Sequence, residues 1–184
     1  LNDSINRQYA LMENLLLWAC SQTNKLEFKP EIVDLKHLSY EIVTLYQELA
    51  GKKEIVINSE ISKSFFVFVD KEMISTVIRN IVNNAIKFTN NSGRIKIYFS
   101  EDSVNETIQL IVEDNGVGIS AENLQKLFCV DEKITSKGTN NEIGTGLGLI
   151  VCKEFIEKNS GSIHAESEVG AGSKFRITLK TAKS

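Results

Sequence analysis

Three polar side chains share one face of a predicted helix, and their chemistry suits a magnesium-bound phosphate. Asn80, Asn84 and Lys87 lie at positions i, i+4 and i+7 within residues 71–89, where the apolar pattern predicts a helix. Residues at this spacing project from the same side of a helix. Amide oxygens can help complete the water-rich octahedral shell of Mg²⁺, and the lysine adds a positive charge for phosphate. An ordinary solvated helix face would show the same pattern.

Two glycine-rich segments offer backbone donors to a phosphate. Residues 114–118 read DNGVG after a predicted strand, and residues 144–149 read GTGLGL before a predicted helix. Gly146 and Gly148 at a helix start would expose backbone N–H groups at the positive end of the helix dipole. Neither segment matches GxxxxGK[ST] or GxGxxG, so a P-loop enzyme or a Rossmann fold would lack its central feature. A tight turn with a glycine-rich cap is the alternative.

The composition of the chain excludes several classes of protein. The chain has 184 residues, 42% of them hydrophobic, which is enough for one domain of ordinary size and an appendage. The net charge of -3 leaves no basic stripe for nucleic acid. The three cysteines are far apart without CxxC spacing, which indicates reduced thiols. No apolar run reaches the roughly 20 residues that cross a bilayer, so we expect a cytoplasmic domain whose membrane anchor, if any, lies upstream of Leu1.

Residues 1–24 have the pattern of a long helix from a bundle. Apolar residues recur at alternating steps of four and three, and a second row widens the apolar surface beyond what a lone surface helix needs. Ordinary packing onto the same domain is the alternative. Pro30, the only proline, marks the boundary, so we expect a helical unit at 1–29 and a second domain at 30–184. The first row is Ile5, Tyr9, Met12, Leu16 and Ala19, and the second is Leu11, Leu15 and Trp18.

After Pro30, strand and helix patterns alternate. Ile95, Ile97 and Phe99 alternate with polar neighbours, which predicts a sheet with one wet face and helices on the other. The expected fold class is therefore α+β, a two-layer sandwich. We predict extended segments at 31–35, 54–61, 65–70, 94–100, 107–114, 161–167 and 174–180, helices at 37–52, 71–89, 120–128 and 146–158, and a mobile loop at 131–144.

Together, the motifs resemble the histidine-kinase branch of the Bergerat-fold ATPase superfamily, over nearly the whole chain. Several ordered motifs with sensible spacing are far more specific than any one of them. The resemblance implies a mixed sheet and the binding of ATP with Mg²⁺. In family terms, the asparagine box is 80–89, the first glycine box 114–118, the phenylalanine box lies near Phe128, the second glycine box is 144–149 and the last is 170–175.

At the phosphate end, the resemblance implies that Asn84, with Asn80, reaches Mg²⁺ and that Lys87 meets the phosphates. The polar stretch 131–144 resembles the ATP lid, in which Lys137 would contact the γ-phosphate. The second glycine box would cradle the phosphates through Gly144, Gly146, Leu147 and Gly148.

At the adenine end, the resemblance implies that Asp114 accepts a hydrogen bond from the exocyclic amine of the base. Guanine places an acceptor there and would be repelled. Gly116 and Gly118 would let the backbone approach the base, Phe88 would stack near adenine, and Ser173 takes the position of the family's hydroxyl residue.

Position 80 and the two histidines bear on the reaction. Hydrolytic relatives carry a glutamate four residues before the metal asparagine, whereas this chain has Asn80, and an amide is no useful general base. Kinase activity is therefore favoured over ATP hydrolysis.

His37 and His164 lack the acidic neighbour that follows the family's phosphorylated histidine, and both are expected at the surface. This chain alone should therefore not phosphorylate itself.

The expected function is that of the catalytic ATP-binding domain of a sensor histidine kinase. The γ-phosphate would pass to a histidine on a phosphoacceptor helical hairpin of the same protein, then to an aspartate in the receiver domain of a response regulator. The full-length protein is expected to form a homodimer. The alternatives are a Bergerat-fold serine kinase of the anti-sigma type and a non-catalytic nucleotide-sensing module.

Overall fold

The computed structural model describes residues 12, 27–129, 137–140, 142 and 146–182. The predicted long helix at 1–24 lies almost entirely outside these residues, as does much of the predicted loop at 131–144. In chain order, the elements are β1 (Pro30–Asp34), α2 (Leu35–Gly51), β2 (Val56–Ser59), β3 (Phe66–Asp70), α3 (Lys71–Phe88), β4 (Arg94–Asp102), β5 (Thr107–Asp114), α4 (Ala121–Lys126), α5 (Gly148–Lys158), β6 (Ser162–Glu168) and β7 (Gly172–Lys180).

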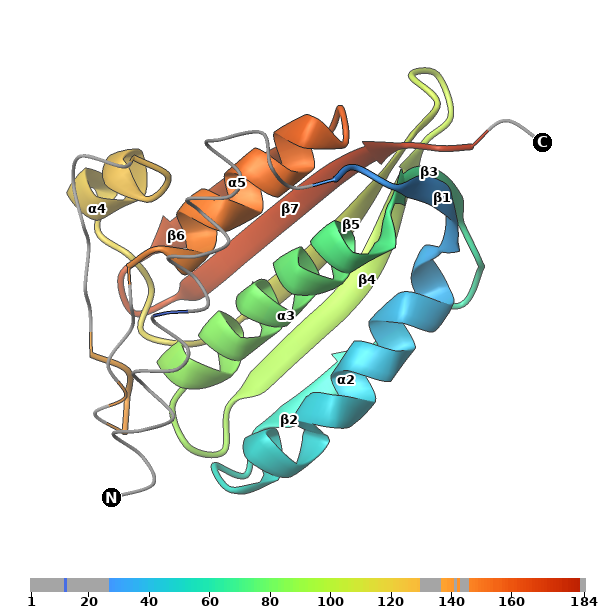
Figure 1. Cartoon of the computed structure of the whole chain (residues 1–184). Helices are drawn as coiled ribbons and strands as arrows, with labels where there is room; N and C mark the ends of the chain where they lie inside the picture. The colour runs from blue at the N-terminus through green and yellow to red at the C-terminus, as the bar shows by residue number, and fades with distance from the viewer. Residues whose placement is uncertain (1–11, 13–26, 130–136, 141, 143–145, 183–184) are drawn as a thin grey trace.

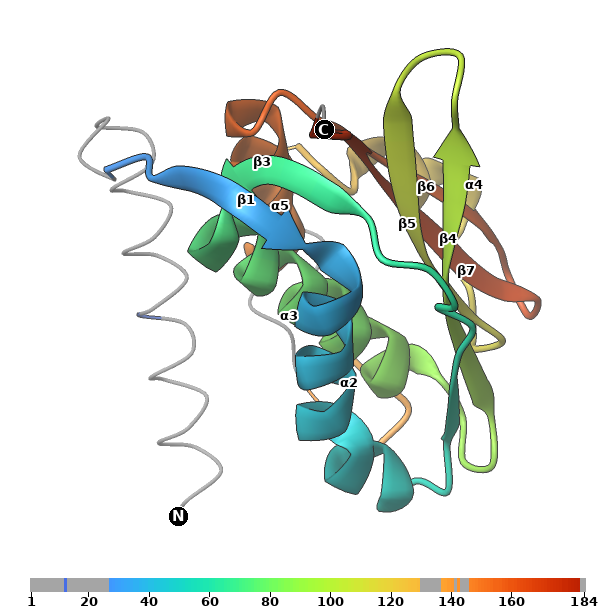
Figure 2. The same cartoon turned by 90° about the vertical axis from the view of Figure 1, so that its right-hand side faces the viewer.

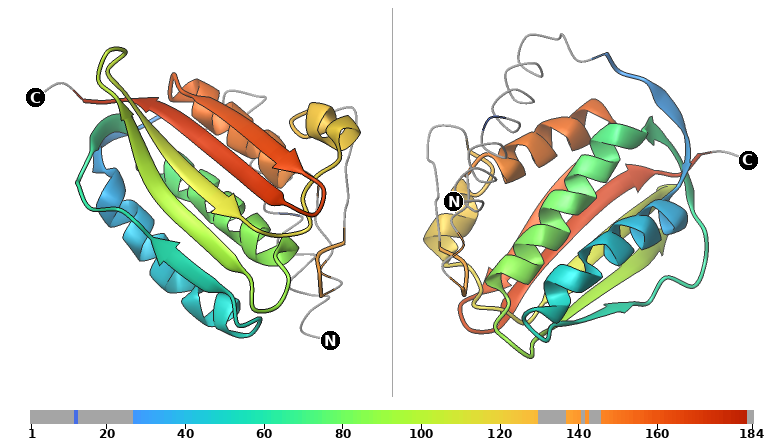
Figure 3. Two further views of the ribbon diagram at one scale, coloured as in Figure 1. Left: turned by 180° about the vertical axis from the view of Figure 1, so that it is seen from behind. Right: turned by 60° about the horizontal axis from the view of Figure 1, so that its bottom comes forward.

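The described residues form two layers. A five-stranded sheet with the order β2-β4-β5-β7-β6 forms one layer. Helices α2, α3 and α5 cover the same face of this sheet, while its other face stays open (Figures 1 and 3). The β2–β4 pair is parallel and the other pairs are antiparallel, so the sheet is mixed. The predicted α+β two-layer sandwich is confirmed.

Alternation along the strands decides which face of the sheet is buried. Ile95 and Ile97 of β4 and Ile177 of β7 are at most 1% exposed and pack beneath the helices. On the open face, the guanidinium of Arg176 pairs with the Glu166 carboxylate across β6 and β7. Such exposed pairs add little stability, so the fold depends on the apolar face.

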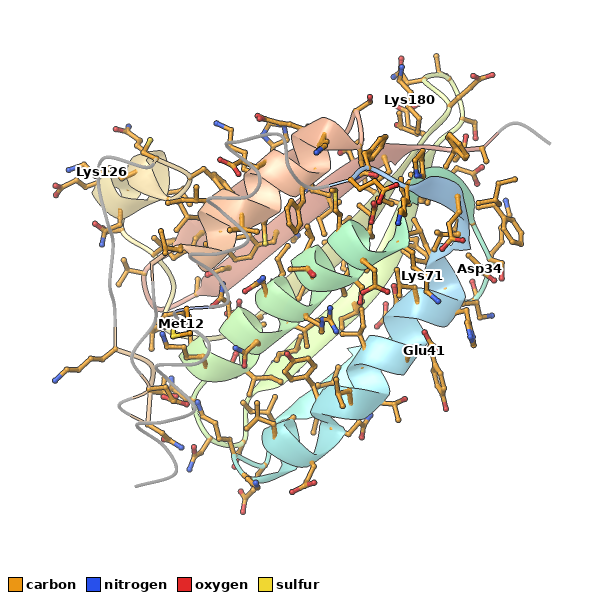
Figure 4. All side chains as sticks on the ribbon, viewed as in Figure 1. Met12, Asp34, Glu41, Lys71, Lys126 and Lys180 are labelled. Atoms are coloured by element: carbon orange, nitrogen blue, oxygen red, sulfur yellow. The ribbon has the colours of Figure 1, made fainter. Side chains whose placement is uncertain are left out.

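Strands β1 and β3 form a separate antiparallel ribbon at the end of the molecule where α2 and α3 begin (Figure 2). Figure 4 labels Asp34 and Lys71 at this end. The carboxylate of Asp70, the last residue of β3, accepts hydrogen bonds from the backbone N–H of Lys29 (2.9 Å) and of Met73 (3.0 Å). Asp70 thereby caps the first turn of α3 and fixes where this helix starts.

Element boundaries differ from the prediction where backbone conformation was invisible in the sequence. Helix α5 begins at Gly148, two residues later than predicted, because Gly146 has a φ of +72° and cannot continue a right-handed helix. Strand β2 begins at Val56, after Glu54, which also has a positive φ. Among the described residues, no helix is both long and apolar enough to cross a membrane.

Candidate functional site

The C-terminal half of α3 carries the predicted polar face. The opposite face of the helix is buried by Ile78, Ile81 and other apolar residues, which leaves Asn80 and Asn84 half-buried at the surface of the helix layer. The Asn80 side-chain amide donates to the Thr76 carbonyl (3.0 Å). This bond turns the Asn80 Oδ1 away from its own helix.

Glycine at position 148 allows Asn80 to approach α5. A Cβ placed on Gly148 would lie 2.8 Å from the Asn80 Oδ1, closer than real Cβ contacts permit. An added Cβ would therefore require the Asn80 side chain to shift, so glycine at position 148 leaves room for that side chain as it stands.

Among the described residues, helix α5 begins without the side-chain cap that α2, α3 and α4 have. The N-cap side chains of α2, α3 and α4, which are Asp34, Asp70 and Ser120, each accept a backbone N–H. The N-cap of α5 is Leu147, a buried apolar residue that makes no such bond. An uncapped first turn presents N–H donors and the positive end of the dipole to an anion.

Lys87 lies at the end of the polar face of α3. Its ammonium is 4.6 Å from the centroid of the Phe88 ring, within range of a cation–π interaction. Burial lowers the pKa of Lys87, and the nearby Glu142 carboxylate raises it in part. A half-buried ammonium of this kind gains by pairing with a phosphate.

Asp114 ends β5 in a buried position, 7% exposed. Its Oδ1 accepts hydrogen bonds from the backbone N–H groups of Gly116 (2.9 Å) and Ser173 (3.2 Å). Loss of water around the carboxylate raises its pKa to about 6, although these two bonds act in the opposite direction. Within the part of the chain that the structure describes, no hydrogen bond reaches its Oδ2.

Close backbone packing surrounds Asp114. A Cβ on Gly116 would lie 2.3 Å from the Phe88 carbonyl oxygen, and one on Gly118 would lie 1.9 Å from the Glu168 carbonyl oxygen. Gly118 also has a φ of +70°. The glycine segment after β5 is thus pressed between the end of α3 and the turn that joins β6 to β7. These contacts call for glycine at positions 116 and 118 within the protein itself, while the approach of their backbone to a base stays a prediction.

Ser173 lies directly opposite Asp114 in the β5–β7 register. Its hydroxyl is 2.9 Å from the Ser167 hydroxyl. Ser167 also donates to the Gly172 carbonyl (2.7 Å) and accepts from the Ile119 backbone N–H (2.8 Å). Sequence reasoning missed Ser167, because a serine in a strand with alternating polar residues carries no distinguishing signal.

The structure brings the predicted residues together to different extents. Asn80 meets the start of α5 at Gly148, and Asp114 meets Gly116 and Ser173. Lys137 is described and exposed, whereas Gly144 lies outside the described residues.

Sequence reasoning also missed Lys53, a lysine that is only 4% exposed. It joins the end of α3 to residues 139 and 142.

The two predicted surface histidines are exposed, and the His37 Nε2 lies 3.3 Å from the Glu41 carboxylate.

Among the residues that the structure describes, no three His, Cys, Asp or Glu side chains gather to hold a metal ion. The Asn80 amide oxygen lies near the start of α5, and such an oxygen suits a hard cation whose remaining ligands are phosphate oxygens and water.

A family comparison decides the class of the protein. The model of the histidine kinase-, DNA gyrase B- and HSP90-like ATPases matches residues 69–183, more than half of the chain. The chain belongs to this ATPase family. All of α3, and the boxes at 114–118, 144–149 and 170–175, fall within the match.

Its relatives in this ATPase family are sensor kinases. The chain is 33% identical over 83% of its length to the adaptive-response sensory kinase SasA of Prochlorococcus marinus, and 27% identical over 96% of its length to the sensor kinase WalK of Staphylococcus haemolyticus. It spans only 41% and 29% of these proteins, respectively.

Solved structures give the same fold. The catalytic domain of the histidine kinase ThkA matches with a TM-score of 0.70 at 29% identity, covering 84% of this chain and 96% of that domain. Full-length ShkA, solved in complex with AMPPNP, matches with a TM-score of 0.82 at 22% identity, covering 99% of this chain and 37% of ShkA.

Proposed function

We propose that this chain is the Mg²⁺-ATP-binding catalytic domain of a sensor histidine kinase. One observation carries the proposal: the uncapped, glycine-rich start of α5 faces the amide side chain of Asn80 on α3. Donors at a helix N-terminus and an amide oxygen close together suit a phosphate chain and its metal ion. The family match and the sensor-kinase relatives support the same function.

The adenine base would bind against Asp114. With Oδ1 occupied by two backbone donors, Oδ2 is left to accept the exocyclic amine of adenine. Guanine carries an oxygen at that position, which the carboxylate would repel. Gly116, Gly118 and Ser173 would allow the base to lie close to the backbone, and Phe88 would contribute an apolar surface beside it.

The triphosphate would bind between α3 and the start of α5. Asn84 and Asn80 would hold Mg²⁺, which when bound neutralises part of the phosphate charge. Lys87 and Lys137 would pair with phosphate oxygens, and Gly144, Gly146, Leu147 and Gly148 would supply backbone contacts. Because Asn80 replaces the glutamate of the hydrolytic relatives, attack by water would be slow, and the γ-phosphate would be kept for transfer.

The phosphate would pass to partners beyond the described residues. We propose a histidine on a helical hairpin of the same protein as the first acceptor, in a homodimer, and the receiver domain of a response regulator as the second. ThkA was solved in complex with the response regulator TrrA, which supports a partner of that class. A cytoplasmic location, with any membrane anchor in another part of the protein, is part of the same proposal.

Binding and transfer can be tested separately. Calorimetry with Mg²⁺ should show binding of ATP and not of GTP. With radiolabelled ATP, the chain alone should take up no stable label, whereas a supplied histidine hairpin from the same protein should acquire acid-labile label. Failure to bind ATP would contradict the proposed function. Binding without transfer to the hairpin would instead favour a nucleotide-sensing module, and label on His37 or His164 would refute the assignment of the acceptor.

A further inference from the structure

A buried lysine, Lys53, lies behind the phosphate end of the proposed site. It follows α2 and is 4% exposed, whereas its neighbour Lys52 has a side chain that is 68% exposed and pairs with Glu48. Burial of an ammonium is costly unless it is paired and hydrogen-bonded. The hydrogen-bond partners of Lys53 therefore show which segments of the chain this side chain connects.

The partners come from two segments that are far apart in the sequence. The ammonium donates to the backbone carbonyls of Ile86 (2.9 Å) and Lys87 (3.1 Å), and to the Thr139 hydroxyl (2.5 Å). It also pairs with the Glu142 carboxylate at 3.2 Å. Two acceptors thus belong to the last turn of α3, where carbonyls form the negative end of the dipole, and two belong to residues 139–142.

These contacts also fix the backbone of Lys87, the proposed phosphate ligand. The Lys87 carbonyl accepts the Thr139 backbone N–H (3.0 Å) in addition to the Lys53 ammonium. The Thr139 hydroxyl lies 2.9 Å from the Thr89 carbonyl and 3.2 Å from the Lys87 carbonyl, and its one proton can go to either. A Cβ on Gly138 would lie 2.6 Å from the Lys87 Cγ. Residues 138–139 are therefore in direct contact with the stem of the Lys87 side chain.

Glu142 links the two lysines. Its carboxylate pairs with the Lys53 ammonium and accepts the Asn140 backbone N–H (2.7 Å). Its charge also acts on the ammonium of Lys87. Without Lys53, the Glu142 carboxylate would lose the ammonium with which it pairs. Thr139 and Glu142 would also lose the side chain that links both of them to the carbonyls at the end of α3.

We propose that Lys53 is a positioning residue that fastens Thr139 and Glu142 to the end of α3 and so sets the place of Lys87 for phosphate binding. The inference rests on the proposed function, because it assigns Lys53 to the site in which Lys87 would meet the triphosphate. Lys53 itself does not contact the nucleotide; it acts through Thr139, Glu142 and the backbone of Lys87.

The test compares Lys53→Met with Lys52→Met, which removes the same charge one residue away. Two measurements are made on each variant of the whole chain. One is the amide hydrogen exchange of Gly138 and Thr139, whose N–H groups donate to the Glu142 and Lys87 carbonyls. The other is the pair of dissociation constants for Mg²⁺-ATP and for adenosine, which carries no phosphate.

In Lys53→Met, exchange at Gly138 and at Thr139 should accelerate about tenfold or more, and the Kd for ATP should rise about tenfold, as for one lost charge-assisted hydrogen bond. The Kd for adenosine should stay within about twofold of the Lys52→Met value, because adenosine carries no phosphate for Lys87 to bind. A change of about tenfold would correspond to the loss of one such bond. A merely structural lysine would instead weaken ATP and adenosine equally. Equal weakening, or wild-type exchange and ATP affinity in Lys53→Met, would overturn the proposal.

A second variant covers the case in which Lys53→Met does not fold. Thr139→Val combined with Glu142→Gln removes one of the lysine's acceptors and the negative charge of another, and it leaves both α3 carbonyls in place. It should show the same accelerated exchange at Gly138 and the same selective loss of ATP affinity. If the unchanged chain binds no ATP, the proposed function fails, while unaltered exchange in this double variant overturns the fastening role on its own.

Discussion

The two ends of the proposed nucleotide site are built in different ways. At the adenine end, Asp114 and Ser173 lie opposite each other on neighbouring strands, and backbone N–H groups hold the carboxylate in place. At the phosphate end, the groups come from one face of α3, the first turn of α5 and a buried lysine, and they act mainly through charge and dipoles. Short-range fit should therefore decide which base binds, whereas electrostatic interactions should supply affinity for the phosphates.

Gly118→Ala should have the largest effect, because the adenine end depends on backbone contact. An alanine at this φ of +70° is strained, and its Cβ would overlap the Glu168 carbonyl. We expect a loss of about 3 kcal/mol in the free energy of unfolding, combining conformational strain and overpacking. Gly170→Ala is the matched control, since Gly170 also has a positive φ but has nothing within 4 Å of an added Cβ.

Urea denaturation measures both variants. Gly170→Ala should lose only about 1 kcal/mol, the cost of the left-handed conformation alone. Equal losses in the two variants would show that contact with the β6–β7 turn is unimportant.

Asp114→Asn should separate binding from stability. The asparagine Oδ1 can still accept the Gly116 and Ser173 N–H groups, but an NH₂ group would face the adenine amine. We expect the Kd for ATP to rise about 100-fold, the equivalent of about 2.7 kcal/mol. Calorimetry gives this value, and Glu113→Gln, on the open face of the same strand, is the control.

The same variant should be more stable at neutral pH. In the folded chain the pKa of Asp114 is raised to about 6 from 3.8, so the folded state holds the proton more tightly and its stability falls as pH rises from about 4 to 6. Removing the charge should therefore add about 1 to 2 kcal/mol to the free energy of unfolding at pH 7.5. A loss of both stability and affinity would mean that Asp114 is only a structural residue.

Lys87→Met tests the phosphate end with a smaller expected effect. The Kd for ATP should rise about tenfold, as for one lost charge-assisted contact, and the Kd for adenosine should not change. Lys71→Met is the control, because Lys71 is an exposed lysine at the opposite end of the same helix (Figure 4). If adenosine affinity fell in parallel, the two ends would not be separable.

The smallest expected effect is the pH dependence of adenosine binding. Adenosine is used because it has no phosphate group that would titrate in the same range. If the ionised form of Asp114 accepts the amine, affinity is present above a pKa of about 6 and declines as the carboxylate is protonated. Lowering the pH from 8 to 6 should raise the Kd of adenosine about twofold, since half of the carboxylates are then protonated. NMR titration can resolve this change, and the Asp114→Asn variant should not show it.

The sequence predicted the fold well because the sheet has one buried face. Strict alternation, as in Ile95 and Ile97, specifies both a strand and its orientation, and the confirmed two-layer sandwich follows from it. The polar face of α3 was visible for a similar reason, since helical periodicity places Asn80 and Asn84 together. The ligand roles of these residues remain predictions.

Other features depend on contacts between distant segments. Lys53 has the local sequence of an exposed lysine, yet its partners Thr139 and Glu142 are 86 and 89 residues away. The roles of Ser167 and of the close Asn80–Gly148 approach likewise arise from tertiary packing. Local propensity and periodicity carry no information on such contacts.

The most direct test is the position of a bound nucleotide. A crystal structure of the chain with Mg²⁺ and a non-hydrolysable ATP analogue should place the exocyclic amine of the base about 3 Å from the Asp114 carboxylate, with the metal ion beside Asn84 and Asn80 and the phosphates at the first turn of α5. A nucleotide bound elsewhere, or an Asn84 side chain turned into the protein interior, would contradict the account.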